Sequence, residues 1–282
     1  MNILTIDHEE WFHILDHPST KNESNWETFP VRIHRNTDLL LEMLSGLDHK
    51  ATFFCLGWIT RKYPDVVRKI IAEGHEIACH SDRHQLVFEQ RPEQFREDLR
   101  AALGSIEEVT GKKVVTYRAP GFSVNESTLW AFDILAEAGI ENDSSIFAAS
   151  RAHGGFRSFG EAKPSVILRN GVSIREFPIN TYNVFGYPIV FSGGGYFRLL
   201  PYPVIKYMSG RSPYILSYFH PRDFDPGQPV LKDLSLVRRV KSYVGLSGAQ
   251  KKFMQWIGDF PSIDISTAVT LINWEKAPVV KL

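Results

Sequence analysis

Two histidines, His80 and His84, stand four residues apart in the segment GHEIACHSDRH (74–84). In a helical turn, side chains with this spacing project to the same side. Two imidazoles and a carboxylate, with further coordination positions left open, are typical of a catalytic zinc site. The zincin motif has Glu directly after the first histidine, but residue 81 is Ser, so a general base would have to come from another segment. The pair alone is a weak signal, because two polar residues on a helix surface often have the same spacing.

Other ionisable residues follow apolar segments that have the composition of buried strands. In a parallel α/β barrel the carboxyl ends of all strands open onto one face, where active sites are built. Random scatter would not place such residues at five successive strand ends, so this concentration predicts catalysis. The residues are Asp7, His8 and Glu9 after ILTI (3–6), His80 after EIAC (76–79), Arg118 after VVTY (114–117), Asp143 after the helix that stops at Gly139, and His220 after YILSYF (214–219).

Strand-like and helical segments alternate through the first 145 residues. Two predicted helices start at Pro64 and Pro92 and stop at Gly74 and Gly111, which is the usual placement of proline and glycine at helix ends. Further helices are expected over about 37–46 and 125–139. This alternation predicts an α/β fold of right-handed βαβ units with a parallel sheet or barrel.

The rest of the chain is more irregular. A hairpin is expected around Asn170-Gly171, three glycines follow one another at 193–195, and helical stretches cover 235–244 and about 247–257. We treat residues 1–282 as a single domain, in which 226–282 form a C-terminal helical extension. The polar segment 10–36 is a long insertion after the first strand, and such segments are either functional or plain surface loops.

Composition excludes several classes of protein. The 32 Lys and Arg balance the 32 Asp and Glu, so nothing in the bulk charge indicates nucleic-acid binding. The chain is 43% hydrophobic but has no apolar run of the length of a membrane span, and we see no signal peptide at its start. The two cysteines, Cys55 and Cys79, lie in apolar segments, which is typical of buried thiols in a reducing compartment. We therefore expect a cytoplasmic globular protein.

Five motifs occur in order along the chain: TIDHE, HSDRH, RAPGF, NDSSIF and LSYFHP. Over residues 1–225 the chain resembles the carbohydrate esterase family 4 polysaccharide deacetylases, also called the NodB homology domain. FSGGGYFRLLPY and the tail are similar to the variant found in exopolysaccharide and O-antigen biosynthesis. The resemblance implies a distorted (β/α)7 barrel with loop and hairpin insertions. It also implies a divalent metal, whose activated water removes an acetyl group from an N-acetylated sugar, oligosaccharide or polysaccharide precursor.

The resemblance also implies roles for individual residues. The fourth motif departs from the family pattern at Asp143, because the tryptophan that usually follows the family aspartate is absent. By this resemblance, Asp7 is the general base, His80 and His84 are metal ligands, Arg118 pairs with the base, His220 is the general acid, Asp143 orients that acid, and Pro120, Gly121 and Phe122 of the third motif contact the substrate.

The third metal ligand departs from the commonest family pattern. There the first motif has two adjacent aspartates, the second of which binds the metal, and that position is His8 here. A related branch spaces its carboxylates by one residue, which matches Asp7 and Glu9. Residues 7 and 9 of an extended strand face the same way, whereas residue 8 points to the other side. We therefore favour Glu9, with His8 as the alternative, and expect zinc, although iron, cobalt or nickel fits the same ligands.

Two other functions share these features. One is a hydrolase of the same fold that acts on a linear or cyclic amide without a sugar. The other is a carbohydrate-binding relative without catalysis, for which His8 at the second-aspartate position is the only support. Metal content and acetate release separate these readings, while the sugar, its linkage and the oligomeric state are left open by the sequence.

Overall fold

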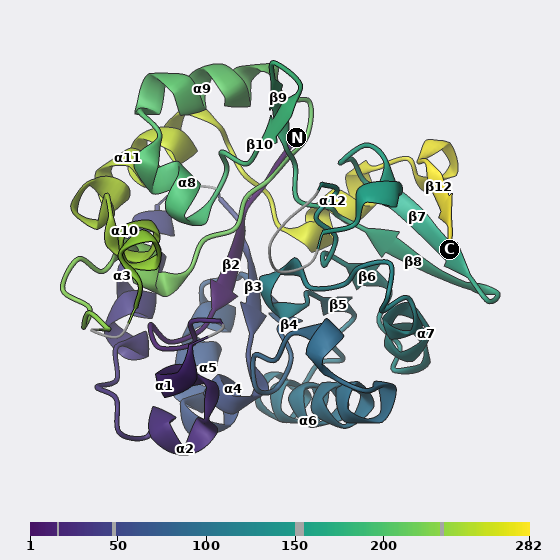
Figure 1. Ribbon diagram of the computed structural model, residues 1–282, viewed down its shortest axis with the longest axis horizontal. Helices are drawn as coiled ribbons and strands as arrows, with labels where there is room; N and C mark the ends of the chain where they lie inside the picture. The colour runs from purple at the N-terminus through teal and green to yellow at the C-terminus, as the bar shows by residue number, and fades with distance from the viewer. Residues whose placement is uncertain (16, 47–48, 150–154, 232–233) are drawn as a thin grey trace.

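Parallel strands form the centre of the fold (Figure 1). The computed structural model describes residues 1–15, 17–46, 49–149, 155–231 and 234–282. From one edge to the other, seven parallel strand positions follow one another in space. They are β11 (Ile215–Leu216), β1 (Asn2–Ile3) continuing into β2 (Thr5–His8), β3 (Thr52–Cys55), β4 (Glu76–Cys79), β5 (Thr116–Tyr117), β6 (Asn142–Asp143) and β8 (Val172–Glu176).

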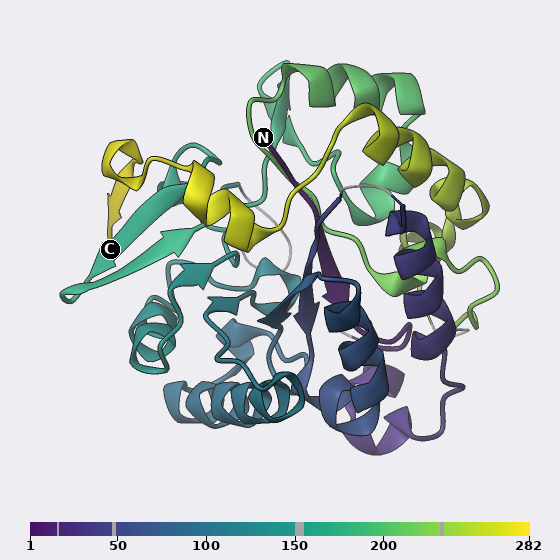
Figure 2. The ribbon, with the colours of Figure 1, turned by 180° about the vertical axis from the view of Figure 1, so that it is seen from behind.

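Helices cover the outer side of these strands and fill the rest of the fold (Figures 1 and 2). The α-helices are α1 (Pro18–Lys21), α2 (Glu23–Trp26), α3 (Ile33–Leu44), α4 (Gly57–Lys62), α5 (Pro64–Ala72), α6 (Pro92–Thr110), α7 (Trp130–Glu137), α8 (Gly194–Leu199), α9 (Tyr202–Arg211), α10 (Leu236–Tyr243), α11 (Leu246–Asp259) and α12 (Ile265–Leu271). Short 3₁₀ helices are η1 (Val87–Glu89), η2 (Pro120–Phe122), η3 (Arg157–Phe159), η4 (Pro221–Phe224) and η5 (Trp274–Lys276). None of the helices in the described part of the chain has the length and apolarity needed to cross a bilayer.

The strand order confirms the expected α/β fold, a distorted barrel of seven parallel strands. The distortion lies between β8 and β11, where side chains complete the ladder. Asn180 Oδ1 accepts hydrogen bonds from the backbone N of Leu216, at 3.0 Å, and from Ser192 Oγ, at 3.0 Å. Gly193 then forms a parallel bridge with Tyr218. The barrel wall is therefore closed here by a buried amide and one short bridge.

The predicted hairpin is present, and the tail differs from the prediction. Strand β7 (Ser165–Arg169) pairs antiparallel with β8 on either side of Asn170-Gly171. The C-terminal extension, expected to be helical, ends instead in β12 (Val279–Lys281), which pairs parallel with β7. The reason is that β7 has an open edge, whose backbone groups need partners. A second hairpin, β9 (Tyr182–Val184) with β10 (Tyr187–Ile189), lies beside α9 (Figure 1).

The insertion 10–36 is ordered by a buried aromatic cluster. Trp11, Phe12 and Trp26 are each at most 4% exposed and pack with Trp58 of α4. The Trp11 indole N–H donates to Pro30 O at 2.9 Å. Because these rings are buried in the protein, they are not available to stack on a sugar. The insertion thus forms one wall beside the end of β2.

Helices α8 to α11 form a lobe apart from the helices that follow β3, β4 and β5 (Figure 1). Gly193 lies where this lobe meets the barrel. A Cβ at residue 193 would overlap the carbonyl oxygen of Tyr218, so only glycine permits the bridge.

We predict that Gly193→Ala lowers the free energy of unfolding by about 1–3 kcal/mol, since the added methyl forces the two segments apart. Gly104→Ala is the matched control, because Gly104 lies within α6 and a Cβ there meets nothing within 4 Å. It should be neutral or stabilising by up to about 1 kcal/mol. Urea unfolding of both variants measures the difference, and equal stability of the two would contradict the close approach at Gly193.

Candidate active site

Two buried carboxylates lie at the carboxyl end of β2. Asp7 and Glu9 are each 4% exposed, and both point toward the barrel mouth. His8 points to the opposite face, where its Nε2 lies 2.9 Å from Thr37 Oγ1 and its Nδ1 lies 3.7 Å from Cys55 Sγ. This alternation is the one expected for an extended strand. The geometry therefore favours Glu9 over His8 as a group that can reach an ion among the other side chains.

Arg118 holds Asp7 in place. Its fully buried guanidinium donates from Nη1 to Asp7 Oδ1 and to Thr5 Oγ1, each at 2.7 Å, and from Nη2 to Ser144 Oγ at 2.9 Å. Burial raises the pKa of Asp7, but the opposing effect of Arg118 and of nearby histidines is larger, so its pKa lies below the ordinary value. Asp7 is consequently a carboxylate at neutral pH, with Oδ1 occupied by Arg118.

Glu9, His80 and His84 are the residues that could hold a metal ion. One ligand atom from each lies within 4.8 Å of the others, and the described residues contain no other such group. Burial raises the pKa of Glu9, but the charge and hydrogen bond of His84, 2.7 Å away, lower it to about 2. Burial lowers the pKa of His80 to about 4, so that imidazole is neutral at pH 7. Its Nδ1 donates to Arg118 O at 2.9 Å, which leaves the Nε2 lone pair free for a ligand.

The two histidines meet without forming a helical turn. Ser81 and His84 both have positive φ angles, of 69° and 56°, so the helical turn expected between the two histidines does not form. The ring centroids are nevertheless 5.3 Å apart. Asp98 of α6 shapes the loop, because its carboxylate accepts from the backbone N–H groups of Asp82, at 2.8 Å, and Arg83, at 3.2 Å.

His220 lies across the mouth from these ligands. It follows β11 and begins η4, and its Nε2 is 3.8 Å from Asp7 Oδ2 and 3.7 Å from Glu9 Oε1. Its Nδ1 lies 3.0 Å from Asp223 Oδ2, and its backbone N–H donates to the same oxygen at 2.9 Å. Burial alone would lower the pKa of His220, but Asp223 raises it to about 9. His220 is thus an imidazolium at neutral pH, with Nε2–H directed at the carboxylates.

The partner of His220 differs from the expected one. Asp143 was expected to orient this ring, but its oxygens accept from Ser145 Oγ, at 2.6 Å, and from Ser145 N, at 3.1 Å. Burial raises the pKa of Asp143, and that of the adjacent buried Glu176 lies well above its ordinary value, so this pair retains a proton. Asp223 takes the orienting place instead. The sequence signal for it was the spacing H-P-x-D, in which the side chain at the third helical position bonds back to the cap residue.

A buried arginine supports Asp223. Arg198 of α8 places its Nε 3.1 Å from Asp223 Oδ1, and both side chains are at most 5% exposed. Burial raises the pKa of Asp223, but Arg198 and His220 together lower it below the ordinary value. No local pattern joins Arg198 to His220, since the two residues stand 22 positions apart along the chain.

The third motif lines the mouth from another side. Pro120, Gly121 and Phe122 form η2, where Gly121 has φ 62° and Phe122 has φ 53°. A Cβ at residue 121 would lie 2.7 Å from Leu15 Cδ1, so Gly121 lets the insertion pack closely here. Phe122 is 3% exposed and its ring lies 5.2 Å from the Arg118 guanidinium. Phe122 therefore packs against the arginine that holds Asp7, and its contact with substrate stays a prediction.

His13 was not singled out by the sequence. It is 4% exposed, its ring centroid lies 6.0 Å from that of His84, and the backbone N of Glu10 donates to its Nδ1 at 3.1 Å. Burial lowers the pKa of His13 to about 3, so the ring is neutral and its proton sits on Nε2. This side chain forms part of the wall behind the candidate ligands.

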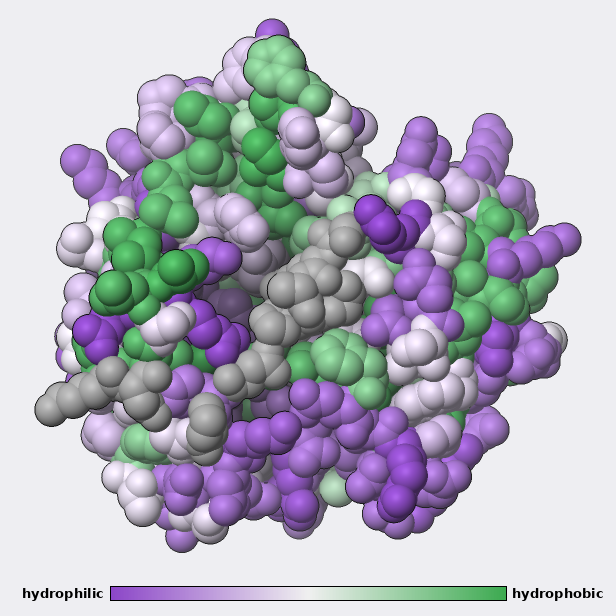
Figure 3. Space-filling view, in the orientation of Figure 1, coloured by the Kyte–Doolittle hydropathy of each residue, from purple (hydrophilic) through white to green (hydrophobic). Residues whose placement is uncertain are grey.

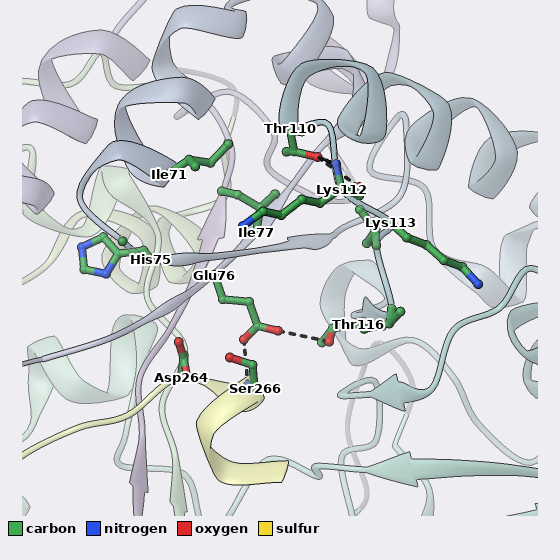
Figure 4. A pocket seen from close by; sticks show the side chains of 13 residues that line it. Ile71, His75, Glu76, Ile77, Thr110, Lys112, Lys113, Thr116, Asp264 and Ser266 are labelled. Atoms are coloured by element: carbon green, nitrogen blue, oxygen red, sulfur yellow. Dashed lines mark hydrogen bonds between the residues drawn. The ribbon is translucent and has the colours of Figure 1, made fainter. Parts of the chain in front are cut away.

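A separate groove of about 310 Å³ lies at the opposite ends of the strands (Figure 4). Its central carboxylate, Glu76, is already bonded to Thr52 Oγ1 at 2.5 Å, Thr116 Oγ1 at 3.3 Å and the backbone N of Ser266 at 3.0 Å. These bonds join β4 and β5 to the start of α12. The groove thus has a structural explanation and lies far from the convergent ionisable residues.

Comparisons with known proteins agree with this arrangement. Residues 17–142 match the family model described as polysaccharide deacetylase, and residues 144–270 match a domain of unknown function (DUF3473). Over residues 17–142 the chain is thus similar to the polysaccharide deacetylases. Asp7 and Glu9 precede the matched range, and His220 lies within the range of the second model. The candidate site therefore draws on residues from both matched segments and from the stretch before them.

Individual relatives are distant. A bifunctional xylanase/deacetylase from Pseudobutyrivibrio xylanivorans is 27% identical over 170 residues, which are 59% of this chain and 27% of that protein. A peptidoglycan-N-acetylglucosamine deacetylase from Bacillus cereus is 32% identical over 93 residues, 33% of this chain and 34% of that protein. The aligned parts thus span about a third or less of these curated relatives. A solved structure from Mycobacterium smegmatis, whose description assigns it to the polysaccharide deacetylases, is 18% identical to this chain and superposes with a TM-score of 0.63. The superposition covers 100% of this chain and 94% of the other chain, which supports the fold.

We predict that Asp223→Asn lowers the pKa of His220 from about 9. Asn removes the negative charge that favours the imidazolium, so burial then favours the neutral ring and the proton is lost at lower pH. Titration of the imidazole nitrogens by NMR in metal-free protein measures this shift. Asp225→Asn is the control, since Asp225 pairs with Arg32 at 2.6 Å and should leave the titration of His220 unchanged. An unaltered His220 titration in Asp223→Asn would contradict the assigned pairing.

Proposed function

We propose that this protein is a deacetylase, which uses a divalent metal ion to remove an N-acetyl group from an N-acetylated sugar, oligosaccharide or polysaccharide precursor. One observation carries the proposal. A carboxylate, Asp7, and an imidazolium, His220, face each other at 3.8 Å beside the candidate ligands Glu9, His80 and His84. Amide hydrolysis needs a base for the attacking water and an acid for the departing nitrogen, and opposed charge states in one site supply both.

The donor set fits zinc. Glu9 is ionised, His80 is neutral, and His80 has its Nδ1 proton engaged by a backbone carbonyl, which are the states that ligation requires. Two imidazoles and a carboxylate also suit iron, cobalt or nickel. When bound, such an ion makes water acidic enough to be deprotonated near neutral pH and polarises the amide carbonyl.

Asp7 is placed to act as the base. Arg118 occupies Oδ1 and keeps the group ionised, so Oδ2, which faces His220 and the barrel mouth, is the oxygen that can take a proton from the attacking water. The buried guanidinium also fixes the direction of that oxygen through its bonds to Thr5 and Ser144. A base that cannot rotate needs no reordering when the substrate binds.

His220 is placed to act as the acid. As the bond between the acetyl carbon and the nitrogen breaks, Nε2–H can give its proton to the departing amine, leaving acetate and a free amino sugar. Asp223 holds Nδ1, so the proton that leaves is the one on Nε2. The sugar class rests on the names of relatives, such as the peptidoglycan-N-acetylglucosamine deacetylase, together with the matched family model.

We predict that Asp7→Asn and His220→Gln each lower kcat by about 10²–10⁴-fold, because each removes a proton transfer. Acetate release from N-acetylglucosamine oligomers by zinc-loaded protein measures the effect. Asp143→Asn is the control: its carboxylate bonds to Ser145 rather than to His220, so kcat should stay within about tenfold of wild type. Undiminished acetate release by both Asp7→Asn and His220→Gln would contradict the proposal.

We also predict that Glu9→Gln weakens zinc binding by at least about 100-fold, since loss of a ligand should cost more than loss of a supporting hydrogen bond. His8→Gln should keep zinc affinity, because His8 lies on the other face of β2. Competition with a chromophoric chelator measures both constants. If His8→Gln lost zinc and Glu9→Gln retained it, the assignment of the third ligand would be reversed.

A further inference from the structure

The segment 177–258 differs in charge from the rest of the chain. It contains ten Lys or Arg, three Asp and no Glu, so its net charge is +7 in a chain whose total is zero. Two of the three acids, Asp223 and Asp225, are buried and paired with arginines. The segment comprises the β9–β10 hairpin, α8 to α10, β11, η4 and all of α11 except its last residue, Asp259, which pairs with Lys206. Arg198 is buried as well, but the described cations at the surface of the segment still outnumber its acids.

Most of the exposed large apolar side chains lie in the same segment. Among the described residues, 17 large hydrophobic side chains are exposed, and 11 of them lie in 177–258. Phe185 and Tyr187, in the β9–β10 hairpin, are 98% and 75% exposed. Figure 3 shows hydrophobic residues gathered over α8, α9 and α10 on the face seen in Figure 1. Such a concentration marks an interaction surface rather than scattered exposure.

Helix α10 is the clearest part of this surface. None of its residues is buried, and Leu236, Val237 and Val240 are 76%, 65% and 54% exposed. Tyr196 and Leu199 of the neighbouring α8 are 52% and 51% exposed. Arg238, Arg239 and Lys241 intervene between the apolar residues of α10. At its end, Tyr243 packs against the buried aromatic cluster and anchors the helix. An amphipathic helix whose aliphatic and basic side chains remain exposed suits the interface of a bilayer.

This surface is joined to the candidate active site. Arg198 donates from Nη1 to Ser242 O at 2.9 Å and from Nη2 to Lys241 O at 3.0 Å, so it holds the end of α10. The same guanidinium contacts Asp223 through Nε. At the other side, Arg238 Nη2 donates to Leu15 O, at 3.0 Å, in the insertion beside the site. Helix α10 therefore lies at the rim of the barrel mouth.

We propose that α10 and the adjoining part of α8 dock on an anionic lipid bilayer. Neutral sugars would favour aromatic platforms, whereas α10 presents aliphatic side chains; an excess of cations favours anionic head groups over an uncharged partner. The docking goes beyond deacetylation and does not require it. Taken together with the proposed function, it would bring the barrel mouth to N-acetylated sugars carried on a lipid.

The test is sedimentation with vesicles of phosphatidylcholine containing about 30% phosphatidylglycerol, an anionic lipid. Wild-type protein should bind these vesicles, bind pure phosphatidylcholine more weakly, and release as salt rises. The double variant Leu236→Glu/Val240→Glu should bind at least about tenfold more weakly, since two apolar contacts become charged. Leu271→Glu/Val279→Glu is the matched control, because these side chains are 63% and 56% exposed but lie outside the segment.

Absence of wild-type binding to the anionic vesicles would overturn the proposal, and so would equal losses in both double variants. A third outcome is that wild-type protein does not bind vesicles but is retained on an insoluble polysaccharide. If Leu236→Glu/Val240→Glu alone abolished that retention, the surface would be a polysaccharide-binding face and the membrane proposal would be wrong. Acetate release from soluble oligomers should be the same in wild type and both double variants. If the wild-type protein released no acetate, the proposed deacetylation would be contradicted. The membrane proposal would still be decided by the vesicle binding alone.

Discussion

The site depends on the burial of two ionised carboxylates at the end of one strand. Asp7 and Glu9 are almost inaccessible to solvent, and such burial is costly unless positive charge lies close by. Arg118 compensates Asp7, His84 contacts Glu9, and His220 lies between both. Each of these groups therefore lies within 4 Å of a buried carboxylate.

This need ties distant parts of the chain together. Arg118 comes from the end of β5, the His80–His84 loop from the end of β4, and His220 from the end of β11. His220 in turn depends on Asp223 and, through it, on Arg198 of α8. The segment matched by the polysaccharide deacetylase model supplies His80, His84 and Arg118, and the segment matched by DUF3473 supplies His220 and its support.

Local patterns predicted much of this arrangement. Proline starts and glycine stops located α5 and α6, and strand alternation separated Glu9 from His8. The prediction that Asp143 orients His220 was wrong. The order of motifs along the chain does not say which carboxylate lies beside the ring in space. The helical turn predicted from His80 to His84 was also wrong. Asp98, a residue of α6, shapes this loop through tertiary hydrogen bonds to its backbone. Such long-range contacts leave no periodic signal in the sequence.

Anomalous diffraction at the zinc edge, from crystals grown with equimolar zinc at neutral pH, tests the central claim most directly. We expect one peak among Glu9, His80 and His84, at about 2.0–2.2 Å from a carboxylate oxygen and two imidazole nitrogens. Asp7 should remain bonded to Arg118. A peak beside His8, or no peak with Glu9 still paired to His84, would contradict it.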